Sequence, residues 1–149
     1  MGIKLKNRVE LEDLQCGIGG NQAVSTTPIA IFLIPFSCVL KGILARVRTA
    51  GTTATANIDI RKNGTSIFAS GATAIQFASG SVTPTYGAIA ATNPPTFVKG
   101  DILTIVVTAI NTTPAVDTAI ALVFQKQQGS GVTSALQLDT LGPEAGVGA

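Results

Sequence analysis

The acidic side chains are the first place to look for chemistry, because this sequence contains no histidine. Histidine is the commonest general base and metal ligand near neutral pH. Between residues 28 and 126 the carboxylates are Asp59, Asp101 and Asp117. Two of them could in principle hydrolyse a glycosidic bond. However, Asp59 is expected to point outward from a strand, Asp101 and Asp117 each follow a turn, and there is no tryptophan to stack on a sugar. The inventory predicts that the protein is not an enzyme.

The two cysteines and the glycine-rich stretch were considered as cofactor sites. Cys16 and Cys38 lack the spacing of a zinc site and have no histidine partners. They could pair or stay free, and reduced thiols are the default because no secretion signal precedes them. Cys38 lies in an apolar run and is expected to pack as a small hydrophobe. Residues 17–20 do not form a dinucleotide fingerprint. The sequence therefore predicts no cofactor and no metal.

Charge and hydropathy narrow the range of partners. The net charge of +2 comes from 10 basic and 8 acidic residues, which is too balanced for nucleic-acid binding. Residues 29–40 are the most membrane-like segment, but they are shorter than the roughly 18 residues of a membrane span and contain Pro35. We expect them to form a buried pair of strands. The sequence thus predicts neither a nucleic-acid nor a membrane partner.

The elements that would position these residues are short strands separated by turns. Asn63-Gly64 is typical of the tight turn of a β-hairpin, because both residues tolerate positive φ. Residues 29–34 are apolar at every position, so this strand is either buried on both faces or lies at an interface. About eight such strands in residues 28–126 predict an antiparallel β-sandwich.

Alternation along the strands predicts which side chains form the core. On 39–49 it places Leu40 and Leu44 on one face and Ile43 and Val47 on the other. The expected core contributors share an apolar character and a period of two, and they include Ile58, Ile60, Leu103, Ile105, Val107, Ile120 and Leu122.

Composition divides the chain into three parts. Residues 1–27 are expected to be an N-terminal docking arm, with a glycine hinge at 17–20 and a possible short helix at 9–14. Residues 28–126 are the expected sandwich, and residues 127–149 a flexible C-terminal tail.

Three segments together resemble a known family. They are Ile34-Pro-Phe-Ser-Cys-Val-Leu-Lys-Gly-Ile-Leu-Ala-Arg-Val47, Ile58-Asp-Ile-Arg-Lys-Asn-Gly-Thr-Ser-Ile-Phe68 and Phe97-Val-Lys-Gly-Asp-Ile-Leu-Thr-Ile105. Their order and spacing resemble small jelly-roll β-sandwich structural proteins of tailed bacteriophages. The resemblance implies a structural module of the virion, and the neutral body with its N-terminal arm favours a capsid decoration (cement) protein that binds the major capsid protein. Such a protein is made in the host bacterial cytoplasm and lies on the outer surface of the virion head. The alternative is a head- or tail-fibre module that recognises a bacterial surface glycan.

Two surfaces are expected to make contacts. The partner-binding candidates lie in the arm, where charged and apolar residues alternate: Lys4, Lys6, Arg8, Val9, Leu11 and Leu14. The other possibility is an N-terminus folded back on its own sandwich. Residues 63–98 carry no charged side chain, which predicts either a homo-oligomer, most simply a homotrimer, or a surface solvated by hydroxyl groups.

Overall fold

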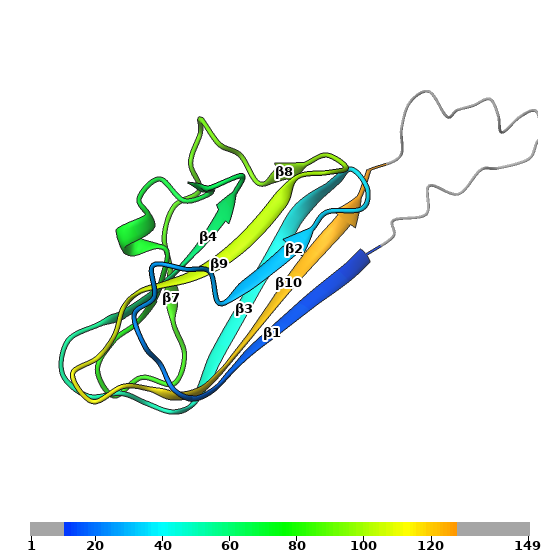
Figure 1. Cartoon of the computed structure of the whole chain (residues 1–149). Helices are drawn as coiled ribbons and strands as arrows, with labels where there is room; N and C mark the ends of the chain where they lie inside the picture. The colour runs from blue at the N-terminus through cyan, green and yellow to red at the C-terminus, as the bar shows by residue number, and fades with distance from the viewer. Residues whose placement is uncertain (1–10, 128–149) are drawn as a thin grey trace, which may run out of the picture.

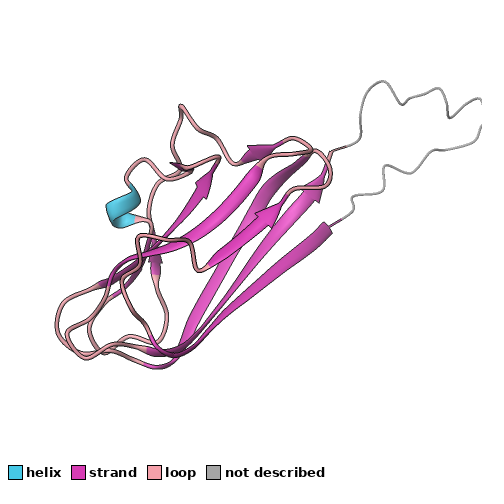
Figure 2. Ribbon diagram, viewed as in Figure 1, coloured by secondary structure: helices cyan, strands magenta, loops and turns pink. Residues whose placement is uncertain are grey.

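A computed structural model describes residues 11–127, which form two antiparallel β-sheets packed face to face (Figures 1 and 2). Sheet A has the strand order β1-β10-β3-β8, and sheet B has the order β2-β9-β4-β6-β7 with β5 beside β4. The strands of sheet A are β1 (Leu11–Asn21), β10 (Val116–Lys126), β3 (Cys38–Thr49) and β8 (Thr96–Phe97). Those of sheet B are β2 (Ala30–Leu33), β9 (Ile102–Ala109), β4 (Ala56–Lys62), β5 (Thr65–Ser66), β6 (Ile75–Phe77) and β7 (Thr85–Tyr86). The prediction of an antiparallel all-β fold is confirmed.

The core between the sheets is the one that alternation predicts. All seven residues expected to contribute to it belong to the buried cluster, with exposed fractions of at most 2%. Cys38 is also buried there, as expected for a small hydrophobe. Burial of this alternating apolar set drives the two sheets together.

The N-terminal part of the sandwich differs from the prediction. Residues 11–21 form strand β1, which pairs with β10 from Leu11 opposite Gln125 to Asn21 opposite Val116. The expected boundary between arm and sandwich at residue 27 is therefore wrong for residues 11–21, and residues 11–14 are not helical. The glycines at 17–20 lie within this strand, and the Gly20 amide donates a hydrogen bond to Asp117. They are not a free hinge. Residues 1–10 and 128–149 of the expected arm and tail lie outside the described residues.

Strand β3 contains an irregularity that the sequence pattern did not predict. The pairing with β10 shifts by one residue, so that Gly42 lies opposite Val123 but Leu40 lies opposite Phe124. An extra residue in one strand moves the following side chains to the other face. Consequently Leu40 is buried and Leu44 is exposed, although simple alternation put them on the same face.

The segment 29–40 is not a pair of strands that contact each other. Its first half is β2 at the edge of sheet B, whereas Cys38 begins β3 in sheet A. Residues 34–37 link the two sheets, so the expected buried strand pair is wrong.

The hairpin turn at Asn63-Gly64 is as predicted. Asn63 and Gly64 have φ values of 50° and 88°, and Lys62 pairs with Thr65 across the turn. The Asn63 side chain also accepts a hydrogen bond from the Ile102 amide and donates one to Asp101. Through these hydrogen bonds the turn between β4 and β5 is linked to the beginning of β9.

Candidate functional site

Asp59 is the carboxylate whose surroundings differ most from expectation. It points away from the core between the sheets, as alternation predicts, but it is only 1% exposed rather than solvated. Arg61 Nε donates a hydrogen bond to Asp59 Oδ2 at 2.8 Å, and Ser66 Oγ donates one to Oδ1 at 2.6 Å. Both carboxylate oxygens are thus occupied by partners within the fold.

A short 3-10 helix, η1 (Gly71–Thr73), covers the outer face of β4 at this point. Asn57, also on β4, is 2% exposed, and its side-chain amide donates to the Gly71 carbonyl oxygen at 2.6 Å. A Cβ atom placed on Gly71 would lie 2.8 Å from Asp59 Oδ2. The close approach of the covering segment explains why polar residues of this strand are shielded from water.

The other two expected carboxylates have structural partners as well. Asp101 accepts hydrogen bonds from the Asn63 side chain and the Val98 amide, and these lower its pKa from the ordinary value. The Gly20 amide and then Arg48 lower the pKa of Asp117. A carboxyl group held in its ionised form is a poor proton donor near neutral pH. No observed contact joins the carboxylates of Asp59, Asp101 and Asp117, so the three do not form a shared site.

The cysteines and the other potential ligands form no metal-binding group among residues 11–127. Cys16 and Cys38 are both free, and burial raises the pKa of each thiol, with the charge of Asp101 adding to the effect at Cys38. A thiol with a raised pKa is a weak nucleophile at neutral pH. In the described part of the chain, no helix has the length and apolar character that crossing a membrane requires.

Two of the six partner-binding candidates lie among the residues that the structure describes. Lys4, Lys6, Arg8 and Val9 lie outside the described residues. Leu14 faces inward and packs against the core, so it contributes to the sandwich instead of a free docking surface. Leu11, at the beginning of β1, is 61% exposed.

An exposed apolar strip lies on sheet B, at its free edge. Ile31 and Leu33 of β2 are 66% and 69% exposed, while Ala30 and Phe32, which alternate with them, pack against the core. Leu33 lies opposite Ile102 of β9, which is also exposed. Of the two alternatives for this segment, burial on both faces is wrong within the described chain.

The sequence already indicates an interface as one of two alternatives for residues 29–34, but it does not connect Ile102 with that surface. A further signal is that residues 14–40 contain no charged side chain. Edge strands of soluble proteins usually carry such charges.

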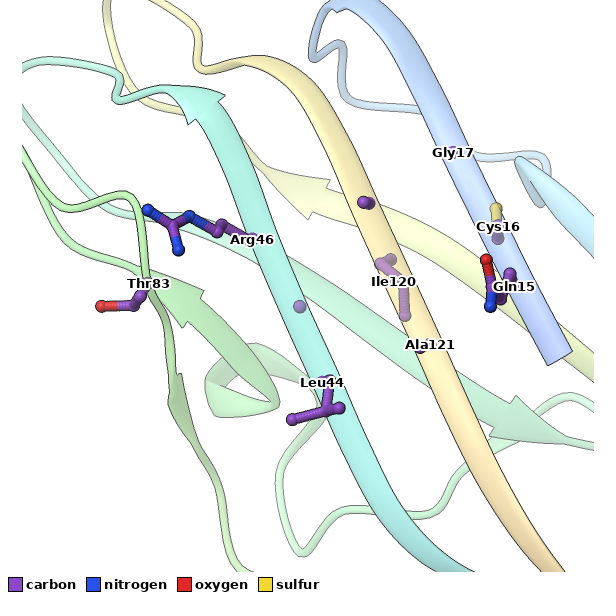
Figure 3. A pocket seen from close by; sticks show the side chains of 10 residues that line it. Gln15, Cys16, Gly17, Leu44, Arg46, Thr83, Ile120 and Ala121 are labelled. Carbon is purple, nitrogen blue, oxygen red and sulfur yellow. The ribbon is translucent and has the colours of Figure 1, made fainter. Parts of the chain in front are cut away.

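The outer face of sheet A contains a shallow hollow of about 590 Å³ (Figure 3). Its lining includes the small residues Gly17, Ala119 and Ala121. Leu44 and Arg46 of β3 lie at one side of it (Figure 3). Leu44 is 65% exposed. Nothing in this hollow forms a charged or hydrogen-bonded cluster that would orient a small molecule.

Comparisons with protein-family models, with curated proteins and with solved structures each found no match. The fold and its surfaces therefore carry the functional argument. They describe an antiparallel β-sandwich in which Asp59, Asp101 and Asp117 have structural partners and in which an apolar strip is exposed on sheet B.

Proposed function

We propose that this protein is a bacteriophage structural protein, a capsid decoration protein that binds the outside of the head shell through its first ten residues. The proposal includes the jelly-roll connectivity and the self-association, most simply as a homotrimer, that the sequence suggests. A protein that binds only the expanded shell stabilises that shell by its binding free energy. Several linked copies would increase the effective concentration of each contact.

The observation that carries the proposal is a reversal of the apolar pattern around residue 12. In β1 the inward-facing residues have even numbers, and Leu14, Cys16 and Ile18 all pack against the core. Before that point the apolar residues have odd numbers, namely Ile3, Leu5, Val9 and Leu11. Side chains of a strand alternate between its faces, so the two sets cannot share one face of a continuous strand. The apolar side of the first ten residues therefore suits a surface other than this chain's own core.

Charge supports the same assignment. Lys4, Lys6 and Arg8 occupy the alternate positions in the sequence, so addition to a partner as a strand would place the basic side chains opposite the apolar ones. A short amphipathic segment of this kind can add to a partner surface by strand addition, with the charges setting specificity and association rate.

The test compares the full chain with a variant lacking residues 1–10, which leaves β1 complete. Both are sedimented with expanded, DNA-free shells assembled from the major capsid protein of the phage that carries this sequence. We expect the full chain to sediment with the shells and the shortened chain to stay in the supernatant while keeping the circular dichroism spectrum of a folded β-protein. Undiminished binding by the shortened chain would refute the docking role.

A pair of matched variants separates the two sides of the segment. Replacing Ile3, Leu5 and Val9 by serine should abolish shell binding at every salt concentration, because the apolar contact is lost. Replacing Lys4, Lys6 and Arg8 by glutamine should weaken binding mainly at low salt, where charge attraction is least screened. If the full chain does not bind shells but binds intact bacterial cells, the fibre-module alternative replaces the proposal.

A further inference from the structure

The free edge of sheet B is the most exposed aliphatic feature of the described chain. Ile31, Leu33 and Ile102 lie side by side, because Leu33 pairs with Ile102 and Ile31 is two residues along the same strand. In the strand order β2 ends the sheet, so its outer backbone groups have no strand beside them. An uncovered apolar edge of this kind promotes association with other chains.

The charged residues closest to this strip in the sheet are engaged within the fold. Thr104 lies opposite both Ile31 and Arg61, and the guanidinium of Arg61 is bound to Asp59. Asp101, beside Ile102, accepts hydrogen bonds from Asn63 and Val98. The strip consequently lacks the protruding charges with which edge strands usually prevent self-association.

We infer that this strip is the contact surface between copies of the chain, with the β2 edge of one copy packed against the β2 edge of another. The inference rests on the self-association included in the proposed function and not on binding to a shell. Ile31, Leu33 and Ile102 carry no charge, so these side chains can meet their counterparts in a second copy without bringing like charges into direct contact. The ionised Asp101 and the exposed Lys99 lie at the end of the strip and not within it.

The extent of the edge fits such a contact. Beyond β2 the chain continues along β9, where Ile29 and Ser25 donate backbone hydrogen bonds to Ile105 and Val107. Val24, at the far end of this segment, is 55% exposed. The edge follows β9 from Ile102 to Val107, which is roughly 20 Å, and a stable interface of about 800 Å² per partner is roughly 30 Å across. The edge can therefore form the centre of such an interface.

The experiment introduces one charge on either sheet. Leu33→Asp places a carboxylate in the strip, and Ile31→Asp is a second variant of the same kind. Leu44→Asp is the matched control, because Leu44 is a leucine of nearly equal exposure on the outer face of sheet A. Native mass spectrometry and sedimentation of the full chain measure the number of copies, and circular dichroism checks the fold.

We expect the unmodified chain and Leu44→Asp to form the same discrete oligomer at micromolar concentration. Leu33→Asp and Ile31→Asp should each raise its dissociation constant by at least roughly thirtyfold, the size of one interface hot spot. A monomeric unmodified chain, a heterogeneous aggregate, or dissociation by Leu44→Asp but not by Leu33→Asp would overturn the inference. Shell binding is measured separately on the monomeric variant, so failure of this contact is distinct from failure of the docking segment.

Discussion

Strands β4 and β2 lie in the same sheet and reverse the usual relation between polarity and exposure. On the outer face of β4, the polar residues Asn57 and Asp59 are at most 2% exposed. On the outer face of β2, the apolar residues Ile31 and Leu33 are at least 66% exposed. The polar strand is covered by η1, whereas nothing in the described chain covers the apolar one.

The comparison shows that the polarity of a strand's outer residues does not by itself predict their exposure to water. The exposure depends on which segment covers that face of the strand. Arg61, Ser66 and Gly71 form hydrogen bonds with the buried polar groups of β4, and Asn57 Oδ1 is the atom of this pair of side chains left without one. The apolar face of β2 has no corresponding partner within the sandwich. In our proposal a second copy supplies that partner.

The largest expected effect comes from breaking the Asp59–Arg61 pair on β4. Arg61→Met would leave a carboxylate that is 1% exposed without its cationic partner. An uncompensated buried charge costs several kcal/mol, so we expect the free energy of unfolding to fall by about 3 kcal/mol. Urea unfolding of the full chain measures it. Arg46→Met, at an exposed position on β3, is the control and should change the value by less than about 0.5 kcal/mol.

A smaller effect is expected from displacing the cover over β4. The added Cβ of Gly71→Ala would contact Asp59 Oδ2 at 2.8 Å, so η1 must shift outward. Overpacking of this kind costs about 1–3 kcal/mol. Gly19→Ala, where a Cβ meets nothing within 4 Å, should have little effect on urea unfolding. Equal unfolding midpoints for the two variants would show that the cover over Asp59 is not tightly packed.

On β2 the same comparison predicts almost no effect on the stability of the single copy. Leu33→Asp changes a side chain that is 69% exposed, so the free energy of unfolding at concentrations too low for association should change by less than about 0.5 kcal/mol. Urea unfolding at nanomolar concentration, followed by fluorescence of an attached dye, measures it. A loss of about 2 kcal/mol would mean that Leu33 packs within its own chain.

The features that were predicted from sequence are those with a local signal. The Asn63-Gly64 turn and the alternating core residues of β4 and β9 carry their own backbone or burial preference. The cover over Asp59 comes from residues 71–73, which have no pattern that relates them to β4. The extra residue in β3 lies beside Gly42, a residue type that often marks a bulge in a strand, but simple alternation passes over this signal and therefore misplaces Leu44.

The N-terminal segment shows the same limit. Leu14, Cys16 and Ile18 alternate as a strand does, but the glycines among them indicated a hinge. The pairing with β10, which lies about a hundred residues away in the chain, decides the outcome. For residues 29–34 the sequence left open burial on both faces, and the exposure of Ile31 and Leu33 in the fold excludes it.

The smallest expected effect concerns the Asn63-Gly64 turn after β4, which side-chain hydrogen bonds link to the beginning of β9. The hydrogen bond from Asn63 and then that from the Val98 amide lower the pKa of Asp101 below its ordinary value of 3.8. A carboxyl group whose pKa is lower in the folded state contributes stability that is complete above the unfolded pKa. That contribution disappears as the pH falls through the folded pKa, so acid should weaken the turn. Replacing Asn63 by glycine removes the stronger donor and still permits the positive φ of 50°.

We therefore expect Asn63→Gly to lose less stability than the unmodified chain when the pH falls from about 5 to about 2. The measurement is the free energy of unfolding in urea at several pH values within that range. At pH 7 the variant should be less stable, because the folded Asp101 carboxylate has lost a donor. If both chains lose stability in parallel with falling pH, the hydrogen bond from Asn63 is not what stabilises the ionised Asp101, and the link between β4 and β9 depends on the backbone turn alone.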